Sequence, residues 1–142
     1  MGHSITDFRG AGFTARDWKV EVWLQLLARE VDQLSTPPAW LAAARDHWRE
    51  QATLRINGCI RPELDVYLTD DQRVAVVHNL AQRVYDSLLQ FGERVPRDFL
   101  NGLCRLPQRE QYSQDMQTEV FLVYGRALLK LLNGKMKGHE FA

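Results

Sequence analysis

The hydrophobic residues between positions 115 and 132 recur with the period of an α-helix. At about 100° per residue, one broad arc holds Met116, Val120, Val123, Tyr124, Ala127, Leu128 and Leu131. The polar side chains form only a narrow stripe, made of Glu119, Arg126 and Lys130. A helix that is apolar on nearly every side lies inside a bundle or at a subunit contact. We therefore expect this helix to be the central element, with a neighbouring helix approaching closely at Gly125.

Three further segments show a helical hydrophobic period, at residues 15–34, 37–53 and 70–91. Shorter helices are predicted at 62–68 and 96–102. No convincing run of paired strands is found along the sequence. The pattern therefore predicts an all-α fold, a compact helical bundle of four main helices plus one or two short helices.

The two ends of the chain lack a helical pattern. Residues 1–13 contain Gly10 and Gly12 and are interpreted as an N-terminal arm. Residues 135–142 are interpreted as a frayed C-terminal tail. We expect a single helical domain over residues 1–142, which is close to the commonest domain size.

The charges of the chain balance. Lysine and arginine number 18, and aspartate and glutamate also number 18. Such a chain has no broad basic field of the kind that binds nucleic acid, so we expect no nucleic-acid partner. A net charge near zero favours association over repulsion, and we expect a homo-oligomer.

Targeting signals are also missing from the sequence. The first ten residues have no apolar run like that of a signal peptide. No segment has the roughly 20 mostly apolar residues of a membrane span. We therefore expect a cytoplasmic protein without a membrane partner. Cys59 and Cys104 have no metal-like spacing, and we expect both to be free thiols, buried as small apolar side chains.

Two octets, DWKVEVWL at 17–24 and DMQTEVFL at 115–122, share the pattern Asp-x-x-x-Glu-Val-aromatic-Leu. Each begins a predicted core helix, and its two acidic residues lie four apart on one face. The acidic residues are Asp17, Glu21, Asp115 and Glu119. If the two helices pack side by side, these four carboxylates converge. Bundles build dinuclear iron or manganese sites from such inward carboxylates.

A simpler interpretation of the octets needs no metal. Acidic residues in a first helical turn favour the positive end of the helix dipole, and Val-aromatic-Leu is ordinary core filling. Di-iron bundles also use a Glu-x-x-His pair, whereas this chain has the reverse order in His47-x-x-Glu50. We therefore expect no cofactor, and a divalent iron or manganese ion is the alternative.

An aromatic cluster on the predicted 37–53 helix is a candidate ligand pocket. Its members are Trp40, His47, Trp48 and Gln51. A titratable imidazole beside indole rings suits a small ligand or general acid–base chemistry. The alternative interpretation is that His47 is a partly buried edge residue held by a hydrogen bond.

Trp18, Val22 and Leu26 form a second, thinner apolar arc on the predicted 15–34 helix. The main arc of that helix already accounts for its contact with the core. The second arc is therefore the candidate surface for a partner protein, and tryptophan is enriched at binding hot spots.

No recognised catalytic motif occurs in the sequence. It lacks a nucleophile elbow, a P-loop, a zinc-binding spacing and a Cys-His-Asn signature. We therefore expect a small non-catalytic protein that acts through contacts with another protein, as an adaptor, a regulator or a toxin-neutralising partner. The alternative is a metal-binding or small-ligand-binding bundle with a carboxylate site and enzymatic activity.

Overall fold

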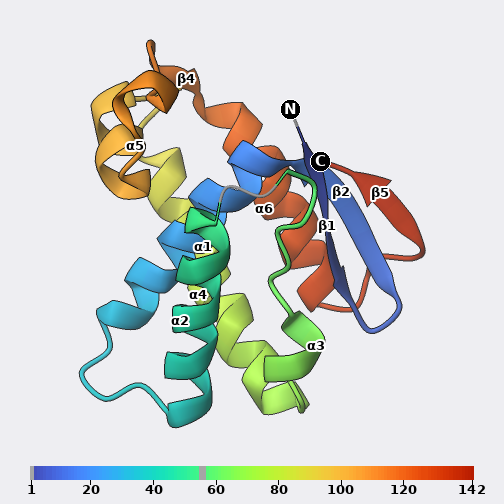
Figure 1. Ribbon diagram of the computed structural model, residues 1–142. Coiled ribbons are helices and arrows are strands. Elements are labelled where there is room, and N and C mark those ends of the chain that lie inside the picture. The colour runs from blue at the N-terminus through green and yellow to red at the C-terminus, as the bar shows by residue number, and fades with distance from the viewer. Residues whose placement is uncertain (1, 55–56) are drawn as a thin grey trace.

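A computed structural model describes residues 2–54 and 57–142, and in these ranges it contains six α-helices and two small β-sheets (Figure 1). The fold is mixed α/β, so the all-α prediction was wrong. The four main helices are Asp17–Asp32 (α1), Ala39–Thr53 (α2), Asp71–Leu89 (α4) and Thr118–Leu132 (α6). The two shorter helices are Leu64–Tyr67 (α3) and Arg97–Cys104 (α5). The strands are His3–Phe8 (β1), Ala11–Arg16 (β2), Arg94–Val95 (β3), Met116–Gln117 (β4) and His139–Phe141 (β5).

The predicted N-terminal arm is a β-hairpin, in which β1 pairs antiparallel with β2. Its turn consists of Arg9 and Gly10, with φ of 51° and 82°, as a two-residue turn that matches the strand twist requires. Strand β1 buries Ser4, Thr6 and Phe8. Because two of these three inward residues are polar, no hydrophobic alternation marks the strand. The sequence pattern missed the hairpin for this reason.

The predicted C-terminal tail was also wrong, because its last residues form a third strand. Strand β5 pairs in parallel with β2, with Phe141 opposite Thr14, and the sheet order is β1-β2-β5. His139 Nε2 and Thr14 Oγ1 are hydrogen-bonded at 2.7 Å. Lys130 of α6 donates to Glu140 Oε2 at 2.6 Å. Figure 1 shows both chain ends beside this sheet, and local sequence patterns do not predict pairing between opposite ends of a chain.

The central helix begins later than predicted. Strand β4 pairs antiparallel with β3, so α6 begins at Thr118 and not near residue 115. Asp115 lies outside the helix, where its Oδ1 accepts a hydrogen bond of 2.9 Å from the backbone N–H of Arg97 in the first turn of α5. This acidic residue therefore satisfies a free N–H group of another helix.

Helix α1, and not α6, packs on all three of the other main helices, so the prediction that α6 is the central element was wrong. Helix α6 lies between the three-stranded sheet and two of the helices. The three-stranded sheet covers one side of it, where the rings of Phe13 and Tyr124 meet edge-on with centroids 5.0 Å apart. Thr6 Oγ1 and Tyr124 Oη share a hydrogen bond of 2.9 Å. Helices α1 and α4 pack on α6 away from the sheet (Figure 1). Although α6 is apolar on most sides, neither it nor another helix in the described ranges is long and apolar enough to cross a membrane.

The close approach predicted at Gly125 is confirmed. A Cβ atom at this position would lie 2.5 Å from Trp23 Cζ2 and 2.8 Å from Tyr85 Cδ2. Trp23 belongs to α1 and is fully buried, and its Nε1 donates to the carbonyl oxygen of Phe121 at 2.8 Å. The glycine therefore lets an indole ring of α1 lie against the backbone of α6.

Candidate binding site

The two octets lie side by side through their aromatic residues. Trp23 and Phe121 hold equivalent positions in the two octets and are joined by the indole–carbonyl hydrogen bond described above. The Trp18 ring also meets the Phe121 ring edge-on, with centroids 5.7 Å apart. The repeated pattern therefore marks a core contact between α1 and α6 that is made by the hydrophobic halves of the octets.

The acidic residues of the first octet lie at the start of α1. Asp17 Oδ1 accepts a hydrogen bond from Ser4 Oγ at 2.5 Å, and Oδ2 accepts one from the Gly58 backbone N–H at 2.8 Å. Ser4 Oγ in turn accepts a hydrogen bond from the Ile60 N–H at 3.1 Å. Asp17 therefore joins β1 and the segment after α2 to the start of α1. Glu21 lines a surface hollow beside it.

The acidic residues of the second octet point to different partners. Asp115 is hydrogen-bonded to the start of α5. Glu119 instead pairs with Arg126 on the surface of α6. The hydrogen bond from Arg126 lowers the pKa of the Glu119 carboxyl. Within residues 2–54 and 57–142, no group of three or more His, Cys, Asp or Glu side chains is placed to hold a metal ion. The convergence of four carboxylates that the metal hypothesis requires is therefore not found there.

The predicted ligand residues of α2 hold the segment that follows this helix. His47 Nε2 is hydrogen-bonded to the Arg61 carbonyl oxygen at 2.8 Å, and Gln51 Oε1 accepts from the Arg61 N–H at 2.8 Å. Trp48 is fully buried and donates to the next carbonyl oxygen at 3.0 Å. Trp40 stands apart and lies under an arginine guanidinium of α4, 4.9 Å from the ring centroid. This geometry matches the interpretation of His47 as a hydrogen-bonded edge residue.

The predicted partner surface on α1 is not continuous. Val22 is fully buried, with 0% exposure. Trp18 and Leu26 are half-buried and line two different cavities. The predicted arc is therefore interrupted by the core, and its Leu26 end lies in an apolar pocket.

This apolar pocket, of about 410 Å³, lies where α1, α4 and α5 meet. Val84 and Leu88 of α4 are buried there, and Leu26 of α1 is half-buried. The rings of Phe91 and Phe99 stand at the pocket with centroids 5.0 Å apart. Phe91, just beyond the end of α4, is 37% exposed. The pocket therefore presents aromatic and aliphatic surface to solvent.

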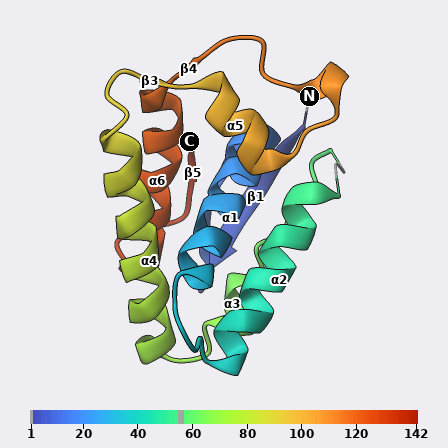
Figure 2. The same cartoon turned by 90° about the vertical axis from the view of Figure 1, so that its left-hand side faces the viewer.

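A second cavity, the polar hollow, has a volume of about 750 Å³ and lies between α1, α2 and α5. Its charged residues are Arg29, Asp32, Arg49, Asp98 and Arg105. It shares Arg29 and Phe99 with the apolar pocket, and the Arg29 guanidinium lies over the Phe99 ring, 5.5 Å from its centroid. Figure 2 shows why the two cavities adjoin. Helix α1 lies between α4 and α2, and α5 lies across one end of these helices. The two cavities are thus neighbours on either side of one Arg–Phe pair.

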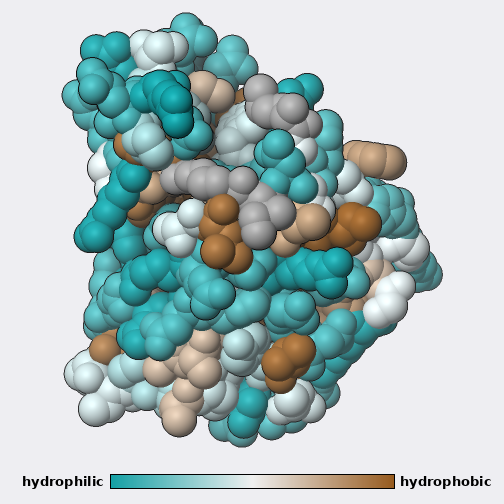
Figure 3. All heavy atoms as spheres, in the orientation of Figure 1, coloured by the Kyte–Doolittle hydropathy of each residue, from teal (hydrophilic) through white to brown (hydrophobic). Residues whose placement is uncertain are grey.

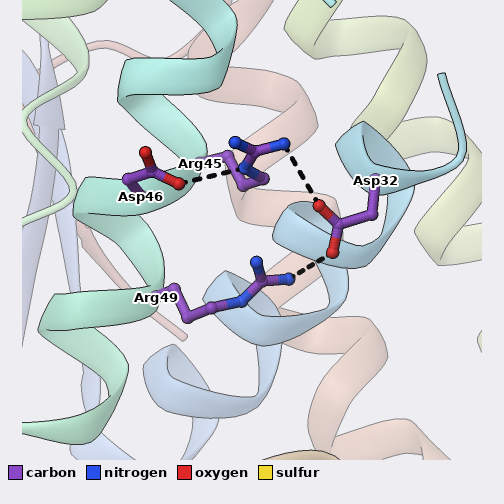
Figure 4. Close-up of polar contacts among 4 residues, drawn as sticks. All are labelled: Asp32, Arg45, Asp46 and Arg49. Atoms are coloured by element: carbon purple, nitrogen blue, oxygen red, sulfur yellow. Dashed lines mark hydrogen bonds and ion pairs between the residues drawn. The ribbon is translucent and has the colours of Figure 1, made fainter. Parts of the chain in front are cut away.

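Two arginines of α2 engage Asp32 at the edge of the polar hollow (Figure 4). Arg45 Nη1 lies 3.3 Å from Asp32 Oδ1, and Arg49 Nη2 lies 2.6 Å from Oδ2. Arg45 Nε also donates to Asp46 Oδ1 at 3.1 Å. Both carboxylate oxygens of Asp32 are therefore occupied. Because these groups are partly exposed, the network joins α1 to α2 with little net stabilisation.

Arg29 and Arg105 differ from these two arginines. No ion pair joins either of them to a carboxylate within the described ranges. Arg105 follows α5 with a φ of 48°, in the left-handed region, where glycine is the usual residue at a helix end. Both guanidinium groups line the polar hollow and keep their charge at every ordinary pH.

Gln25 of α1 is a polar residue in the wall of the polar hollow. Its side chain is only 7% exposed and lines the polar hollow. Within the part of the chain that the structure describes, its amide makes no hydrogen bond. Among the described residues, the buried side-chain atom without a hydrogen bond is Thr118 Oγ1, so the Gln25 amide is open to the solvent in the hollow. A ligand group that enters the hollow can therefore bond this amide in place of water.

Sequence reasoning missed these residues, although a signal was present. Gln25, Arg29 and Asp32 are spaced i, i+4 and i+7, so they form one row along α1. That row crosses a helix that is otherwise strongly apolar. The apolar arcs dominate the pattern of this helix, whereas the polar row between them marks the cavity.

No protein-family model, curated protein or solved structure matches this chain. The chemistry of the two cavities is therefore the basis for a functional assignment.

Proposed function

We propose that this chain is a non-catalytic binding protein that works in the cytoplasm by contact with another protein. The observation that carries the proposal is the apolar pocket between α1, α4 and α5, where the Phe91 ring is 37% exposed. An aromatic and aliphatic pocket with polar residues at its edge is the form of site that receives an anchor side chain of a partner.

The lining of the pocket supports binding over reaction. Its residues within the described ranges include one hydroxyl side chain, Ser87, and one carboxylate, Glu30, and no histidine or cysteine. The buried aliphatic side chains beside Phe91 and Phe99 offer a surface from which an apolar group displaces water. Burial of a partner side chain is the chemistry that such walls perform best.

The surface supports recognition by an inserted anchor. On the face shown in Figure 3, hydrophobic residues appear as small separate patches on a mostly hydrophilic surface. Obligate subunit interfaces are broader and more apolar than this. A single pocket that takes one or two anchor side chains fits such a surface better, because a few buried residues carry most of the binding energy of an interface.

The test is a selection of random linear peptides on the immobilised full chain, followed by affinity measurements with one selected peptide. We expect Phe91→Ser to weaken binding by about tenfold, because an anchor contact of this kind is worth about 1–2 kcal/mol. The matched control is Phe141→Ser, since Phe141 is 81% exposed on β5 and lies outside the pocket.

The proposal fails if no peptide is selected above a blank surface. It also fails if the selected peptides bind Phe91→Ser and the native chain equally well. Thermal unfolding of both variants checks that each remains folded, and we expect little change because both side chains are substantially exposed.

A further inference from the structure

We propose that the polar hollow binds a carboxylate of the partner, held by the Gln25 amide and the guanidinium groups of Arg29 and Arg105. The occupant is an acidic side chain of the same partner segment whose apolar side chain fills the apolar pocket. This inference rests on the proposed function and names the chemistry of the partner.

The first support is the position of the Gln25 amide. The residue is only 7% exposed and lines the hollow, and none of the hydrogen bonds found in the described ranges involves its side chain. Its amide atoms are not among the fully buried ones without a partner, so the amide is open to the solvent in the hollow. A carboxylate oxygen accepts from an amide N–H, so a ligand of this class can take the place of water there.

The second support is the charge of the hollow. Asp32 is engaged by two arginines of α2, whereas Arg29 and Arg105 have no carboxylate partner among the described residues. Guanidinium groups bind carboxylates through short, paired hydrogen bonds. An acidic side chain is therefore the group that complements both arginines.

Charge also distinguishes a carboxylate from a phosphate. The lining carries three arginines and two aspartates, Asp32 and Asp98. Its net charge is therefore a single positive unit, which matches a monoanion. A phosphate monoester carries between one and two negative charges near neutral pH and would be repelled more strongly by the two aspartates.

The third support is the continuity of the two cavities. Both are lined by Arg29 and Phe99, whose guanidinium and ring lie 5.5 Å apart. A peptide segment that crosses this pair can place an apolar side chain on one side and an acidic side chain on the other. The partner segment is therefore expected to carry an acidic residue close to a large apolar residue.

The experiment uses a peptide selected on the full native chain and a second version in which each Glu or Asp is replaced by its amide. Fluorescence anisotropy gives the dissociation constants for the native chain, for Gln25→Leu and for Arg105→Gln. We expect the amide peptide to bind the native chain about tenfold more weakly, because hydrogen bonds to a charged group contribute about 1.5–3 kcal/mol. Gln25→Leu and Arg105→Gln should lose most of this preference for the acidic peptide.

The matched control is Arg83→Gln, which removes the same charge from an exposed site on α4 outside both cavities. It should retain the full preference for the acidic peptide. A second readout is the side-chain amide resonance of Gln25 in ¹H–¹⁵N spectra, assigned by its loss in Gln25→Leu. This resonance should shift with the acidic peptide and not with its amide version, even if a variant proves unstable.

The outcomes separate the two proposals. If the acidic and amide peptides bind equally and binding still depends on Phe91, the carboxylate site is overturned and the proposed function stands. If Arg83→Gln reduces the preference as much as Arg105→Gln, the effect is long-range charge and the site is overturned as well. If no peptide is selected, the proposed function fails and this inference fails with it.

Discussion

At Arg105, the backbone conformation favours glycine, whereas the proposed binding role requires the arginine side chain. Its φ of 48° is costly for a residue with a Cβ atom, yet its guanidinium lines the polar hollow. We predict that Arg105→Gly raises the free energy of unfolding by about 1 kcal/mol, because glycine adopts this conformation without strain. The same variant should bind the acidic peptide more weakly. Urea unfolding and anisotropy measure the two effects.

Arg105→Gln is the companion variant for that prediction. It removes the charge and keeps the left-handed backbone strain, so it should lose peptide affinity without gaining stability. Equal stability of the Gly and Gln variants would show that the backbone conformation at this position costs nothing.

Gly125 is a residue whose surroundings leave no room for a Cβ atom. In an ordinary helix Ala is better than Gly by about 1 kcal/mol. Here the added Cβ would lie 2.5 Å from Trp23 Cζ2 and 2.8 Å from Tyr85 Cδ2, and overpacking of this kind costs about 1–3 kcal/mol or more. We therefore predict that Gly125→Ala lowers the free energy of unfolding by about 1–2 kcal/mol, measured by urea denaturation.

Gly102→Ala is the matched control for the packing effect. Gly102 is also helical, in α5, but a Cβ there meets no atom within 4 Å. The control should be stabilised by about 0.5–1 kcal/mol through helix propensity alone. A gain at both glycines would contradict the close approach of α1 to α6.

At the scale of elements, the sheet is attached to the helices through polar as well as apolar contacts. Thr6 of β1 and Tyr124 of α6 share a buried hydrogen bond of 2.9 Å, and Ser4 joins β1 to Asp17 of α1. Each contact replaces water around a buried polar group. The hairpin therefore belongs to the core although its inward face is largely polar.

This attachment predicts a dependence of stability on alkaline pH. Burial raises the pKa of the Tyr124 phenol above its ordinary value of 10.0, and the hydrogen bond from Thr6 opposes the shift only in part. The folded state therefore retains its proton longer than the unfolded chain. The resulting stability is complete below pH 10.0 and is lost as the pH rises above that value.

Tyr124→Phe provides the measurement for this prediction. The variant lacks the ionisable group, so its free energy of unfolding should fall less steeply than that of the native chain between about pH 9 and about pH 11. It should also be less stable at neutral pH, because Thr6 loses its partner. Parallel slopes for the two chains in urea unfolding would contradict a buried phenol.

The octets show how one pattern can have two explanations at the scale of elements. Their hydrophobic halves meet, since Trp23 of α1 donates to Phe121 of α6. Their acidic halves separate, because Asp17 is hydrogen-bonded to β1 and Asp115 to α5. A spacing of four residues places two side chains on one helix face. It does not determine which neighbour that face meets.

For the whole molecule, the balance of charges predicts self-association that depends on pH. The isoelectric point calculated from the sequence is about 6.9, so repulsion between copies is weakest near neutral pH. We expect sedimentation velocity to show oligomers whose fraction rises with concentration near pH 7. The fraction should fall about two units away in pH, where net charge accumulates. A single monomeric boundary at all concentrations would contradict this prediction.

The helices could be predicted from the sequence because their hydrophobic period is strong and local. The four main helices lie within a few residues of their predicted bounds. The strands could not be predicted in the same way. Strand β1 turns Ser4 and Thr6 inward, and β5 exists because it pairs with β2 at the opposite end of the chain.

The candidate site was predicted only at one residue, Leu26. The local pattern placed it on a second apolar arc, but Val22 in the same arc is buried against the core. Phe91, Phe99 and Arg105 belong to different parts of the chain and come together only when α4 and α5 pack on α1. No local spacing contains that information.

The sequence by itself determined the main helices, because periodic burial is a local property of the chain. It also predicted the close approach at Gly125, because this glycine interrupts a helix that is apolar on most sides. Only the tertiary structure decided that the chain ends form a sheet, that the acidic octets separate, and that Gln25 lines a hollow. Each of these depends on which distant segments meet, and contact between distant segments is set by packing of the whole chain.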